Sequence, residues 1–415
     1  MGFFAVPTKK GLLFLFLAAM ATGVAFMNSG LVTALTAAGF VSLCVPAYIM
    51  AHFCLTGITL KRTFPKDGQI GKILYSEITV QNPLPLFRHT CTVTEELPFA
   101  EKKIFTVPAL RPGELFTLSC PRIAEKRGEY NVEKIVLSSG DPLGLFRKKK
   151  VFKAPCVVQI LPQSIPLASL AGTVGRGGLT DSEGRNLGRA GQGKDFFGVR
   201  PYRIGDEVRH IHWKSTAAKG TLMVKEFEAS AVDQIVILLD TEKKQISREP
   251  SDNNFEFLIS CAASITDYLS KKYCHLSFIA ADGDGYFHHF GGDAASVKGK
   301  IQLALTLLQG GKISLAESLA ASAEYVKPAS IVFLLTMSTD KIPDYITLLQ
   351  EKDCFCHWIW APAENFPPAE EDKPRILYPE KVESMLCGLP VKPLTANFTT
   401  KADELLEGGN TYEKL

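Results

Sequence analysis

The stretch Gly188–Glu228 reads GRAGQGKDFFGVRPYRIGDEVRHIHWKSTAAKGTLMVKEFE, and the rest of the chain is organised around it. Its charged and aromatic side chains neither alternate nor follow a helical stripe, so it does not predict an ordinary core strand or helix. Asp206 is placed to cap a short helical turn that runs toward Trp213. Thr221 to Phe227 alternates like a half-buried strand.

Basic side chains outnumber acidic ones nine to five between Arg185 and Glu228, and aromatic residues lie among them. This pattern fits a structural network in which Asp195 and Asp206 pair with arginines, because buried charges persist only when paired. It equally fits a docking face for another protein, because Arg, Tyr and Trp favour interface hot spots. The modest excess of positive charge disfavours contact with nucleic acid or anionic lipid.

The order of residues in this stretch resembles the signature of the bacterial and archaeal domain-of-unknown-function family fifty-eight. That signature has an aspartate and an aromatic residue, then Gly-x-Arg-x-Tyr-x-x-Gly-Asp, an arginine, a hydrophobic residue and Trp-Lys. His212 stands where an aspartate is frequent. We expect a protein-binding or structural role for the matching residues, which are Asp195, Phe196, Gly198, Arg200, Tyr202, Arg203, Gly205, Asp206, Arg209, Trp213 and Lys214.

The resemblance also reaches upstream, to Arg127-Gly128 and to the segment Asp141–Phe146. It implies that the C-terminal half resembles a von Willebrand factor type A domain. Members of the family often accompany AAA+ ATPases of the MoxR type, so the resemblance implies such a motor as partner. The family has no settled biochemical activity, and the resemblance therefore names no reaction.

Length, charge and cysteines bound the remaining possibilities. A chain of 415 residues holds two or three domains, and a net charge of +3 is too mild to indicate nucleic-acid binding. The ten cysteines form no metal-type C-x-x-C pair. We expect them to be reduced, mostly buried thiols, as in a cytosolic setting.

Residues 1–58 predict a transmembrane helical hairpin. Two apolar runs, Gly11–Met27 and Leu31–Ile58, lack Asp, Glu, Lys and Arg and approach or exceed the ~20 residues that cross a bilayer. Lysines and Arg62 flank the outer ends, whereas the connecting turn is uncharged. The positive-inside rule therefore predicts a multi-pass protein of the cell (inner) membrane whose soluble domains are cytoplasmic. A cleaved signal peptide is the competing interpretation, but the second run would still stop transfer.

Residues 59–161 predict an antiparallel β-sandwich, because short strand-like runs alternate with turn signals and show no long helical pattern. No catalytic grouping is evident in them. Residues 162–228 predict a glycine-rich connection followed by the signature. The glycines suggest a phosphate cradle, but no strand is expected before them and Gly193-Lys194 is followed by Asp195 rather than Ser or Thr.

Residues 229–362 alternate apolar strands with amphipathic helices. This order predicts an α/β domain with a parallel, doubly wound (Rossmann-like) sheet and helices on both faces. Beyond Pro362 the chain becomes proline-rich and acidic, and residues 363–415 are expected to form a loosely held tail.

A von Willebrand type A domain usually holds Mg²⁺ through an Asp-x-Ser-x-Ser motif, a Thr and a second Asp. Here Asp240 is in place, but Glu242 and Lys244 occupy the serine positions and Ser314 is the best substitute for the Thr. The next strand runs into Met337, with Asp340 displaced. Mg²⁺ demands oxygen ligands in near-octahedral order, so we expect a degenerate remnant at Asp240, with no functional metal and no cofactor.

His210 and His212 offer a second metal hypothesis, but a zinc site needs at least a third ligand, and the sequence shows no pattern that supplies one. No Gly-x-Ser-x-Gly elbow indicates nucleophilic catalysis. We therefore predict a membrane-anchored, non-enzymatic adaptor or assembly factor that acts with a MoxR-type ATPase. The alternatives are a metal-dependent enzyme that uses the two histidines, and an envelope adhesion module with its soluble part outside.

Overall fold

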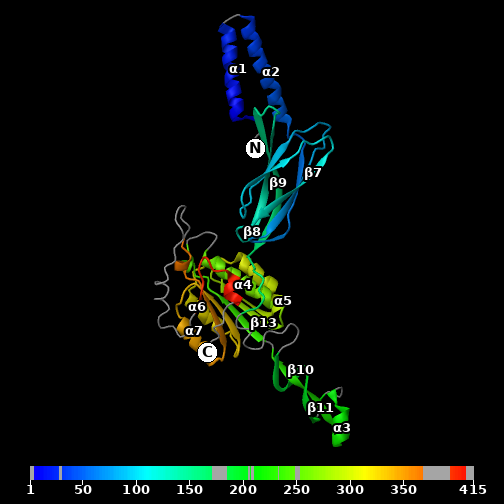
Figure 1. The fold of residues 1–415 in the computed structure, drawn as a ribbon, viewed down its shortest axis with the longest axis vertical. Coiled ribbons are helices and arrows are strands. Elements are labelled where there is room, and N and C mark those ends of the chain that lie inside the picture. The colour runs from blue at the N-terminus through cyan, green and yellow to red at the C-terminus, as the bar shows by residue number, and fades with distance from the viewer. Residues whose placement is uncertain are drawn as a thin grey trace. The chain divides into compact units, whose positions relative to one another are not determined.

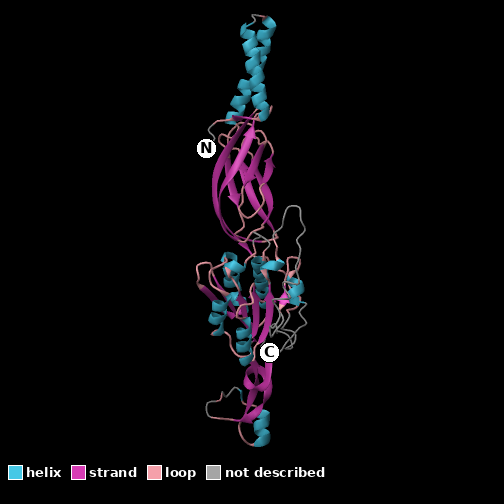
Figure 2. Cartoon of the chain, turned by 90° about the vertical axis from the view of Figure 1, so that its left-hand side faces the viewer, coloured by secondary structure: helices cyan, strands magenta, loops and turns pink. Residues whose placement is uncertain are grey.

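The computed structural model of the chain is shown in Figures 1 and 2. Only the backbone is described for 185–197 and 226–231. The chain divides into two compact units, Met1–Leu161 and Pro162–Leu415. The structure describes residues 4–27, 30–170, 185–203, 206, 210–231, 233–247, 253–367 and 393–407.

The first unit begins with two apolar helices, α1 (Lys9–Met27) and α2 (Leu31–Phe53), which lie side by side (Figure 1). Both are long and apolar enough to cross a membrane, judged by length and composition. Few of their side chains are buried within the chain, so most of their apolar surface is not covered by the described residues. The prediction of two N-terminal apolar helices is confirmed.

The described residues of the first unit also form nine strands (Figure 2). They form one sheet in the order β1-β9-β8-β5-β6, with β3 beside β9, and a second in the order β2-β4-β7. Apart from the parallel pair β3–β9, these strands pair antiparallel, which confirms the predicted antiparallel sheets. The strands are β1 (Val6–Pro7), β2 (Thr59–Thr63), β3 (Asp67–Gln69), β4 (Ile73–Gln81), β5 (Cys91–Glu95), β6 (Lys103–Val107), β7 (Leu115–Ile123), β8 (Gly128–Gly140) and β9 (Phe146–Leu161).

The two sheets share one apolar core. Along β4 every second side chain from Leu74 to Val80 is buried, because successive residues of a strand point to opposite faces. Ile78 packs with Val93 and Ile135 of the other sheet. Side chains from both sheets thus fill the space between them, as in a β-sandwich.

The second unit contains a long hairpin of β10 (Arg185–Pro201) and β11 (Met223–Ala231), which form a sheet of their own. Between them lies the short helix α3 (Trp213–Lys219). The expectation that the glycine-rich residues before Asp195 form a connection without a strand is wrong for Arg185 onward. Pairing tolerates these glycines because the register shifts three times between Asn186 and Gly198, and glycine is common at such irregularities.

The rest of the second unit is an α/β domain with a six-stranded sheet in the order β14-β13-β12-β15-β16-β17. Its pairings are parallel except that β14 runs antiparallel to β13 at the edge. The strands β12, β13 and β15 are almost wholly apolar, as expected for strands covered on both faces. The strands are β12 (Asp233–Leu239), β13 (Cys274–Ala281), β14 (Phe287–Asp293), β15 (Ile331–Thr336), β16 (Phe355–Trp360) and β17 (Leu394–Thr395).

Helices cover both faces of this sheet. On one face α4 (Asn254–Leu269), α5 (Ala294–Leu307) and α9 (Ala402–Glu407) pack on alternate residues of the strands. On the other face α6 (Leu315–Ala323) and α7 (Ile342–Glu351) pack on the intervening residues. The predicted alternation of strands and helices thus produces a three-layered domain with a mainly parallel sheet.

Two segments outside the predicted domain also belong to its core. Strand β17 extends the sheet beside β16, and Leu405 and Leu406 of α9 are buried against α4 and its neighbours. Leu170 is fully buried in the same cluster. The prediction of a loose tail from residue 363 is therefore wrong for 393–407. This segment has few apolar residues and no long periodic pattern, so the sequence did not indicate that it packs on the domain.

Candidate functional site

The signature residues lie in and beside the β10–β11 hairpin. Arg200 and Pro201 pair with Val224 and Met223, and the Tyr202 amide donates to the Leu222 carbonyl at 2.8 Å. The chain then returns, and the His212 amide donates to the Met223 carbonyl at 2.8 Å. Three segments of the signature are thereby joined through their backbones. Beneath them Ile211, Met223 and Val224 are buried and form a small apolar support.

Arg200 and Asp206 form a two-pronged ion pair that fixes the turn after β10. Arg200 Nη1 lies 2.7 Å from Asp206 Oδ2, and Nη2 lies 2.7 Å from Oδ1. The Arg203 amide also donates to Asp206 Oδ2, at 2.8 Å. These hydrogen bonds, from Arg200 first and the Arg203 amide second, lower the pKa of Asp206 to about 2. Parallel Arg–carboxylate bonds fix geometry as well as charge, so this pair holds the turn in place.

Helix α3 begins and ends with its own capping groups. His212 is the N-cap residue, and its Nδ1 accepts from the Ser215 amide and lies 2.8 Å from Ser215 Oγ. Gly220 closes the helix with a positive φ of 68°, which favours glycine. Asp206 was expected to cap a short helical turn that runs toward Trp213, and residues 207–209 of that turn lie outside the described residues. The sequence pattern missed His212 because histidine is not a usual N-cap residue.

An exposed surface results, formed by Arg203, Trp213, Lys214 and Leu222 and called here the Trp213 surface. Trp213 is 65 % exposed and Leu222 is 45 % exposed. None of the seven residues of α3 is buried. The backbone segments that carry these side chains are held together by the hydrogen bonds described above. The arrangement presents a large aromatic group and cations to solvent, as protein-binding surfaces do.

The other predicted signature residues are only partly visible. Gly198 and Tyr202 are half-buried next to the ion pair. Asp195 and Phe196 lie within β10, where only the backbone is described. Gly205 and Arg209 lie outside the described residues. The structure therefore brings together Arg200, Arg203, Asp206, Trp213 and Lys214, and Asp206 pairs with Arg200.

Asp240 lies at the end of β12 and is fully buried. Its Oδ1 accepts from the Glu242 amide at 3.0 Å and its Oδ2 from the Met337 amide at 2.9 Å. Burial raises the pKa of Asp240 to about 6, and those amide hydrogen bonds act in the opposite direction. Asp240 thus ties the loop after β12 to the loop after β15.

The other positions of the expected Mg²⁺ motif also have structural partners. Lys244 lies in a single helical turn, Lys243–Gln245. Ser314 caps α6 together with Glu317, each side chain accepting the other's backbone amide. Within the described part of the chain, no three His, Cys, Asp or Glu side chains converge as metal ligands.

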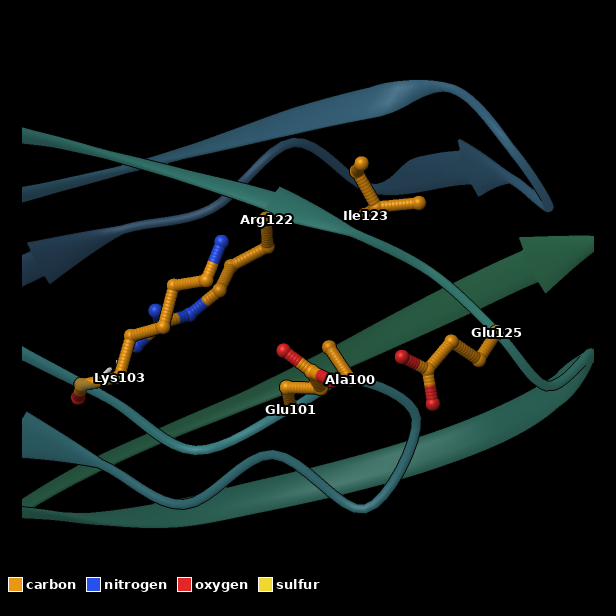
Figure 3. Close-up of a pocket in the computed structure, with 6 residues that line it drawn as sticks. All are labelled: Ala100, Glu101, Lys103, Arg122, Ile123 and Glu125. Carbon is orange, nitrogen blue, oxygen red and sulfur yellow. Dashed lines mark hydrogen bonds between the residues drawn. The ribbon is translucent and has the colours of Figure 1, made fainter. Parts of the chain in front are cut away.

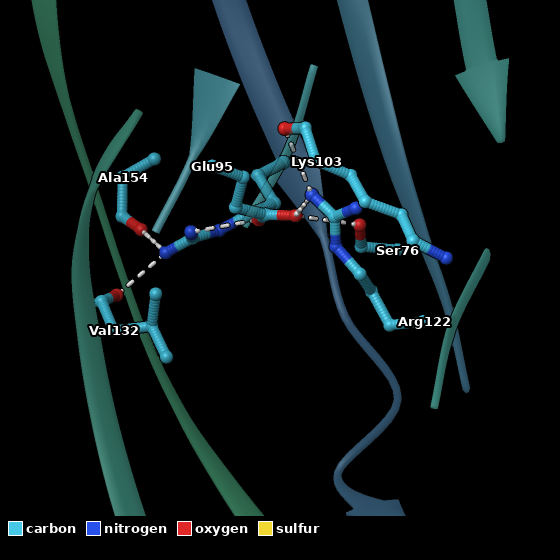
Figure 4. Close-up of polar contacts among 7 residues, drawn as sticks. Ser76, Glu95, Lys103, Arg122, Val132 and Ala154 are labelled. Carbon is cyan, nitrogen blue, oxygen red and sulfur yellow. Dashed lines mark hydrogen bonds and ion pairs between the residues drawn. The ribbon is translucent and has the colours of Figure 1, made fainter. Parts of the chain in front are cut away.

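The sandwich contains a buried charge cluster that the sequence did not indicate. Glu95 is fully buried and lies 3.2 Å from Arg62 Nη1 and 3.8 Å from Arg122 Nη2. Ser76 Oγ donates to the same carboxylate at 3.1 Å (Figure 4). Arg62 also donates to the carbonyls of Val132 and Ala154. Arg62 lies 33 positions before Glu95, and Arg122 lies 27 positions after it, so no local sequence motif marks the cluster.

Arg122 also lines a pocket of about 220 Å³ at one edge of the sandwich (Figure 3). The remaining lining residues are Ala100, Glu101, Lys103, Ile123 and Glu125. Burial lowers the pKa of the Arg122 guanidinium, while Glu95 raises it. The guanidinium lies 4.5 Å from the centre of the Phe105 ring. Two arginines flank one buried glutamate, and Arg122 also lies over an aromatic ring, so we interpret the cluster as part of the core.

Comparison with known families identifies part of the second unit. Residues 198–288, from Gly198 of the signature into β14, match the model of a family described as "Protein of unknown function DUF58". The match confirms the predicted family resemblance. The uncharacterized protein YeaD of Bacillus subtilis (strain 168) is 26 % identical over 160 residues. That alignment covers 38 % of this chain and 37 % of the Bacillus protein.

Solved structures resemble only parts of the chain. The CARDB domain of a Pyrococcus furiosus protein, solved in complex with di-metal ions, is 17 % identical with a TM-score of 0.18. It covers 25 % of this chain and 91 % of that domain. A β-glucosidase from Listeria innocua in complex with glucose is 18 % identical with a TM-score of 0.16, over 24 % of this chain and 16 % of the enzyme. Likenesses this low carry no functional argument.

Proposed function

We propose that this chain, a protein of the DUF58 family, is a membrane-anchored adaptor or assembly factor without enzymatic activity. It acts through protein–protein contacts with an AAA+ ATPase of the MoxR type. Its helical hairpin crosses the cell membrane, and its soluble domains lie on the cytoplasmic side. The Trp213 surface makes the contact with the partner.

The exposure of Trp213 carries this proposal. A tryptophan offers 150–250 Å² of surface to a partner and is among the residues that dominate interface energies. Here 65 % of it faces solvent, on a helix in which no residue is fully buried. The Arg200–Asp206 pair and the two helix caps hold its backbone in one arrangement. A rigid surface of this kind loses little conformational freedom on binding, which favours affinity.

Charge supports the membrane orientation. Lys9 and Lys10 begin α1 and are exposed, whereas the turn between the helices carries no charged residue. An excess of Lys and Arg marks the cytoplasmic ends of membrane helices. Both outer ends of the hairpin join the sandwich, because β1 precedes α1 and β2 follows α2. The sandwich is therefore expected on the cytoplasmic side with them.

The strand order supports a von Willebrand type A-like α/β domain. In chain order the six strands run 3-2-1-4-5-6, the order of doubly wound α/β sheets. In such sheets ligands bind outside the carboxyl ends of the strands. Asp240 occupies that edge, but both of its oxygens already accept backbone hydrogen bonds. We therefore assign Asp240 a structural role and leave the partner contact to the Trp213 surface.

The alternative enzyme needs His210 and His212 as metal ligands. His212 Nδ1 instead caps α3 through Ser215, so its ring orientation serves the helix. The alternative adhesion module needs the soluble part outside the cell. The lysines at the start of α1 disfavour that orientation.

Photo-crosslinking at the Trp213 position tests the proposal. The full-length chain carries a benzophenone amino acid in place of Trp213 and is irradiated in its native membranes. The expected adduct contains a subunit of an AAA+ ATPase. The matched control carries the same amino acid at Tyr286, which is 72 % exposed on the α/β domain. An adduct pattern that is the same at both positions, or that lacks an ATPase at position 213, would contradict the proposal.

A further inference from the structure

The loop Asp141–Phe146, which joins β8 to β9, packs against both apolar helices. Leu145 and Phe146 share a buried cluster with Ala47 and Ala51 of α2, and Phe14 of α1 packs on it. A Cβ at Gly11 of α1 would overlap the carbonyl oxygen of Leu145, so only glycine allows this approach. In Figure 1 the start of β9 lies at the base of the helix pair. The sandwich therefore packs against the start of α1 and the end of α2.

Helix length places this contact at the depth of the lipid headgroups. The 17 residues from Leu31 to Ala47 rise only about 26 Å at 1.5 Å per residue. A bilayer's hydrocarbon core is about 30 Å thick. If α2 crosses the membrane, the boundary of that core falls between Ala47 and Ala51, where the loop is packed. Tyr48 also meets Phe146 there with ring centres 5.4 Å apart, and tyrosines favour this boundary.

A second loop reaches the same end of the sandwich. Arg88 donates to the Phe53 carbonyl at 2.7 Å and to the Thr56 carbonyl at 2.6 Å, which ties it to the end of α2. Just before it, Leu86 and Phe87 are 57 % and 56 % exposed. At the tip of the first loop Leu143 is 56 % exposed. Exposed apolar side chains thus gather on two loops beside the membrane helices, as at membrane-contact sites.

Cations surround these apolar loops. Lys9, Lys10, Arg147 and Lys149 are exposed near the base of the helices. Arg88 and Lys148 instead donate to carbonyls at the end of α2, Lys148 to that of His52 at 2.6 Å. Of the nearby acids, Asp141 accepts the Leu143 and Phe146 amides and Glu114 accepts the Arg111 amide. Glu96 pairs with Lys102 and also attracts Lys149. Lys9, Lys10 and Arg147 are therefore placed to meet negative lipid headgroups, and Lys149 adds positive charge beside them.

We propose that this end of the sandwich is seated on the bilayer surface. Leu86, Phe87 and Leu143 insert among the headgroups, and the exposed cations bind anionic phospholipids. The inference rests on the membrane anchoring proposed above. It adds that the sandwich is held against the lipid by its own loops, in addition to the two helices.

Tryptophan quenching by brominated lipid tests the seating. The full-length Leu143→Trp variant is placed in phosphatidylcholine–phosphatidylglycerol vesicles whose acyl chains carry bromine near the headgroup. The unchanged protein supplies the background from its own tryptophans. The matched control is Ile123→Trp. Ile123 is 51 % exposed and pairs with Ile73, at the opposite end of β4 from Gln81, where the loop that carries Leu86 and Phe87 begins. We expect the fluorescence added at position 143 to be quenched and that added at 123 to be unaffected.

Flotation of the vesicles separates this inference from the anchoring on which it rests. If the protein does not float with the lipid, the membrane anchoring itself fails, and this inference fails with it. If the protein floats but position 143 is quenched no more than position 123, the seating alone is overturned.

A separate experiment tests whether the loops prefer anionic lipid. In mixed vesicles, bromine carried by phosphatidylglycerol should quench position 143 more than the same bromine carried by phosphatidylcholine. Changing Arg147→Gln and Lys149→Gln together should remove most of that difference, because both side chains are exposed cations of β9. If the two brominated lipids quench Leu143→Trp equally while Arg147 and Lys149 are retained, the proposed binding of anionic phospholipids is overturned.

Discussion

At the scale of single residues, buried charge governs the sandwich. Glu95 is the acidic partner of two arginines whose side chains are 1 % exposed. A buried charge that loses its partner costs far more than the pair contributes when intact. Arg62 remains tied to two carbonyls if Glu95 is neutralised, whereas Arg122 keeps a 3.5 Å contact to the Lys103 carbonyl and its position over the Phe105 ring. The stability of the sandwich therefore depends on this one carboxylate.

We predict that Glu95→Gln lowers the free energy of unfolding of the sandwich by ~3–5 kcal/mol, the cost of breaking a buried pair. Glu125→Gln is the matched control, because Glu125 is exposed and surface changes usually stay within ~0.5 kcal/mol. Hydrogen exchange of β5 and β8 amides in the full-length protein measures the difference. Equal protection in the two variants would contradict the role of Glu95.

Asp240 is a second residue whose burial has a measurable consequence. Its pKa is raised from 3.8 to about 6 in the folded chain. Between these values the folded state binds more protons than the unfolded state, so stability falls as pH rises from 4 to 6. We predict that this loss, about 3 kcal/mol for a shift of this size, is absent in Asp240→Asn. Unfolding of both proteins across that range tests it, and a stability difference that does not change with pH would contradict it.

At the scale of elements, the hairpin and α3 depend on one ion pair. The pKa of Asp206 is lowered to about 2 by Arg200 and the Arg203 amide. A lowered pKa means that the carboxylate stabilises the fold above pH 4, and that this contribution is lost as pH falls from 4 toward 2. Arg200→Gln removes the main cause of the lowered Asp206 pKa. We therefore predict that the loss of hairpin stability between pH 4 and pH 2 becomes smaller in this variant.

Amide exchange at Tyr202 and His212, whose amides donate to the Leu222 and Met223 carbonyls, reports on the hairpin. Lys214→Gln serves as control, since Lys214 is exposed on α3. The idea fails if Arg200→Gln and the control show the same exchange at pH 3 and at pH 7.

The sequence indicated several elements because their signals are local. Apolar strands such as Ile331–Thr336 and striped helices such as Asn254–Leu269 carry their period within a few residues. The antiparallel sheets follow from turn signals at regular spacing. Strand β10 escaped prediction because its glycines weaken the strand pattern and pairing depends on β11, more than twenty residues later. Strand β17 escaped because two residues carry no periodic signal.

The candidate site was predictable in its composition but not in its geometry. The signature marked Arg200, Asp206 and Trp213, yet the sequence did not show which arginine pairs with Asp206. That choice depends on a turn whose hydrogen bonds come from backbone amides. The buried cluster of Arg62, Glu95 and Arg122 could not be predicted, because three separate strands or strand ends bring it together.

At the scale of the whole molecule, the account requires one orientation in the membrane. In the proposed orientation both outer ends of the hairpin lie in the cytoplasm, because Lys9 and Lys10 begin α1 and the connecting turn is uncharged. We predict that a reporter fused after Leu415, of a kind that folds only in the cytosol, is active. Digestion of the soluble domains by protease added to intact cells would contradict this orientation.

The central claim is that the Trp213 surface binds a partner, and its most direct test is the affinity of that contact. Purified full-length protein in nanodiscs is titrated with a MoxR-type ATPase, using the unchanged chain, Trp213→Ala and the exposed-site control Tyr286→Ala. Loss of a hot-spot tryptophan costs at least ~2 kcal/mol, or roughly a 30-fold rise in Kd. We predict that rise for Trp213→Ala alone, with an unchanged melting temperature because Trp213 is exposed. The same Kd for all three proteins, or no binding by the unchanged chain, would contradict the account.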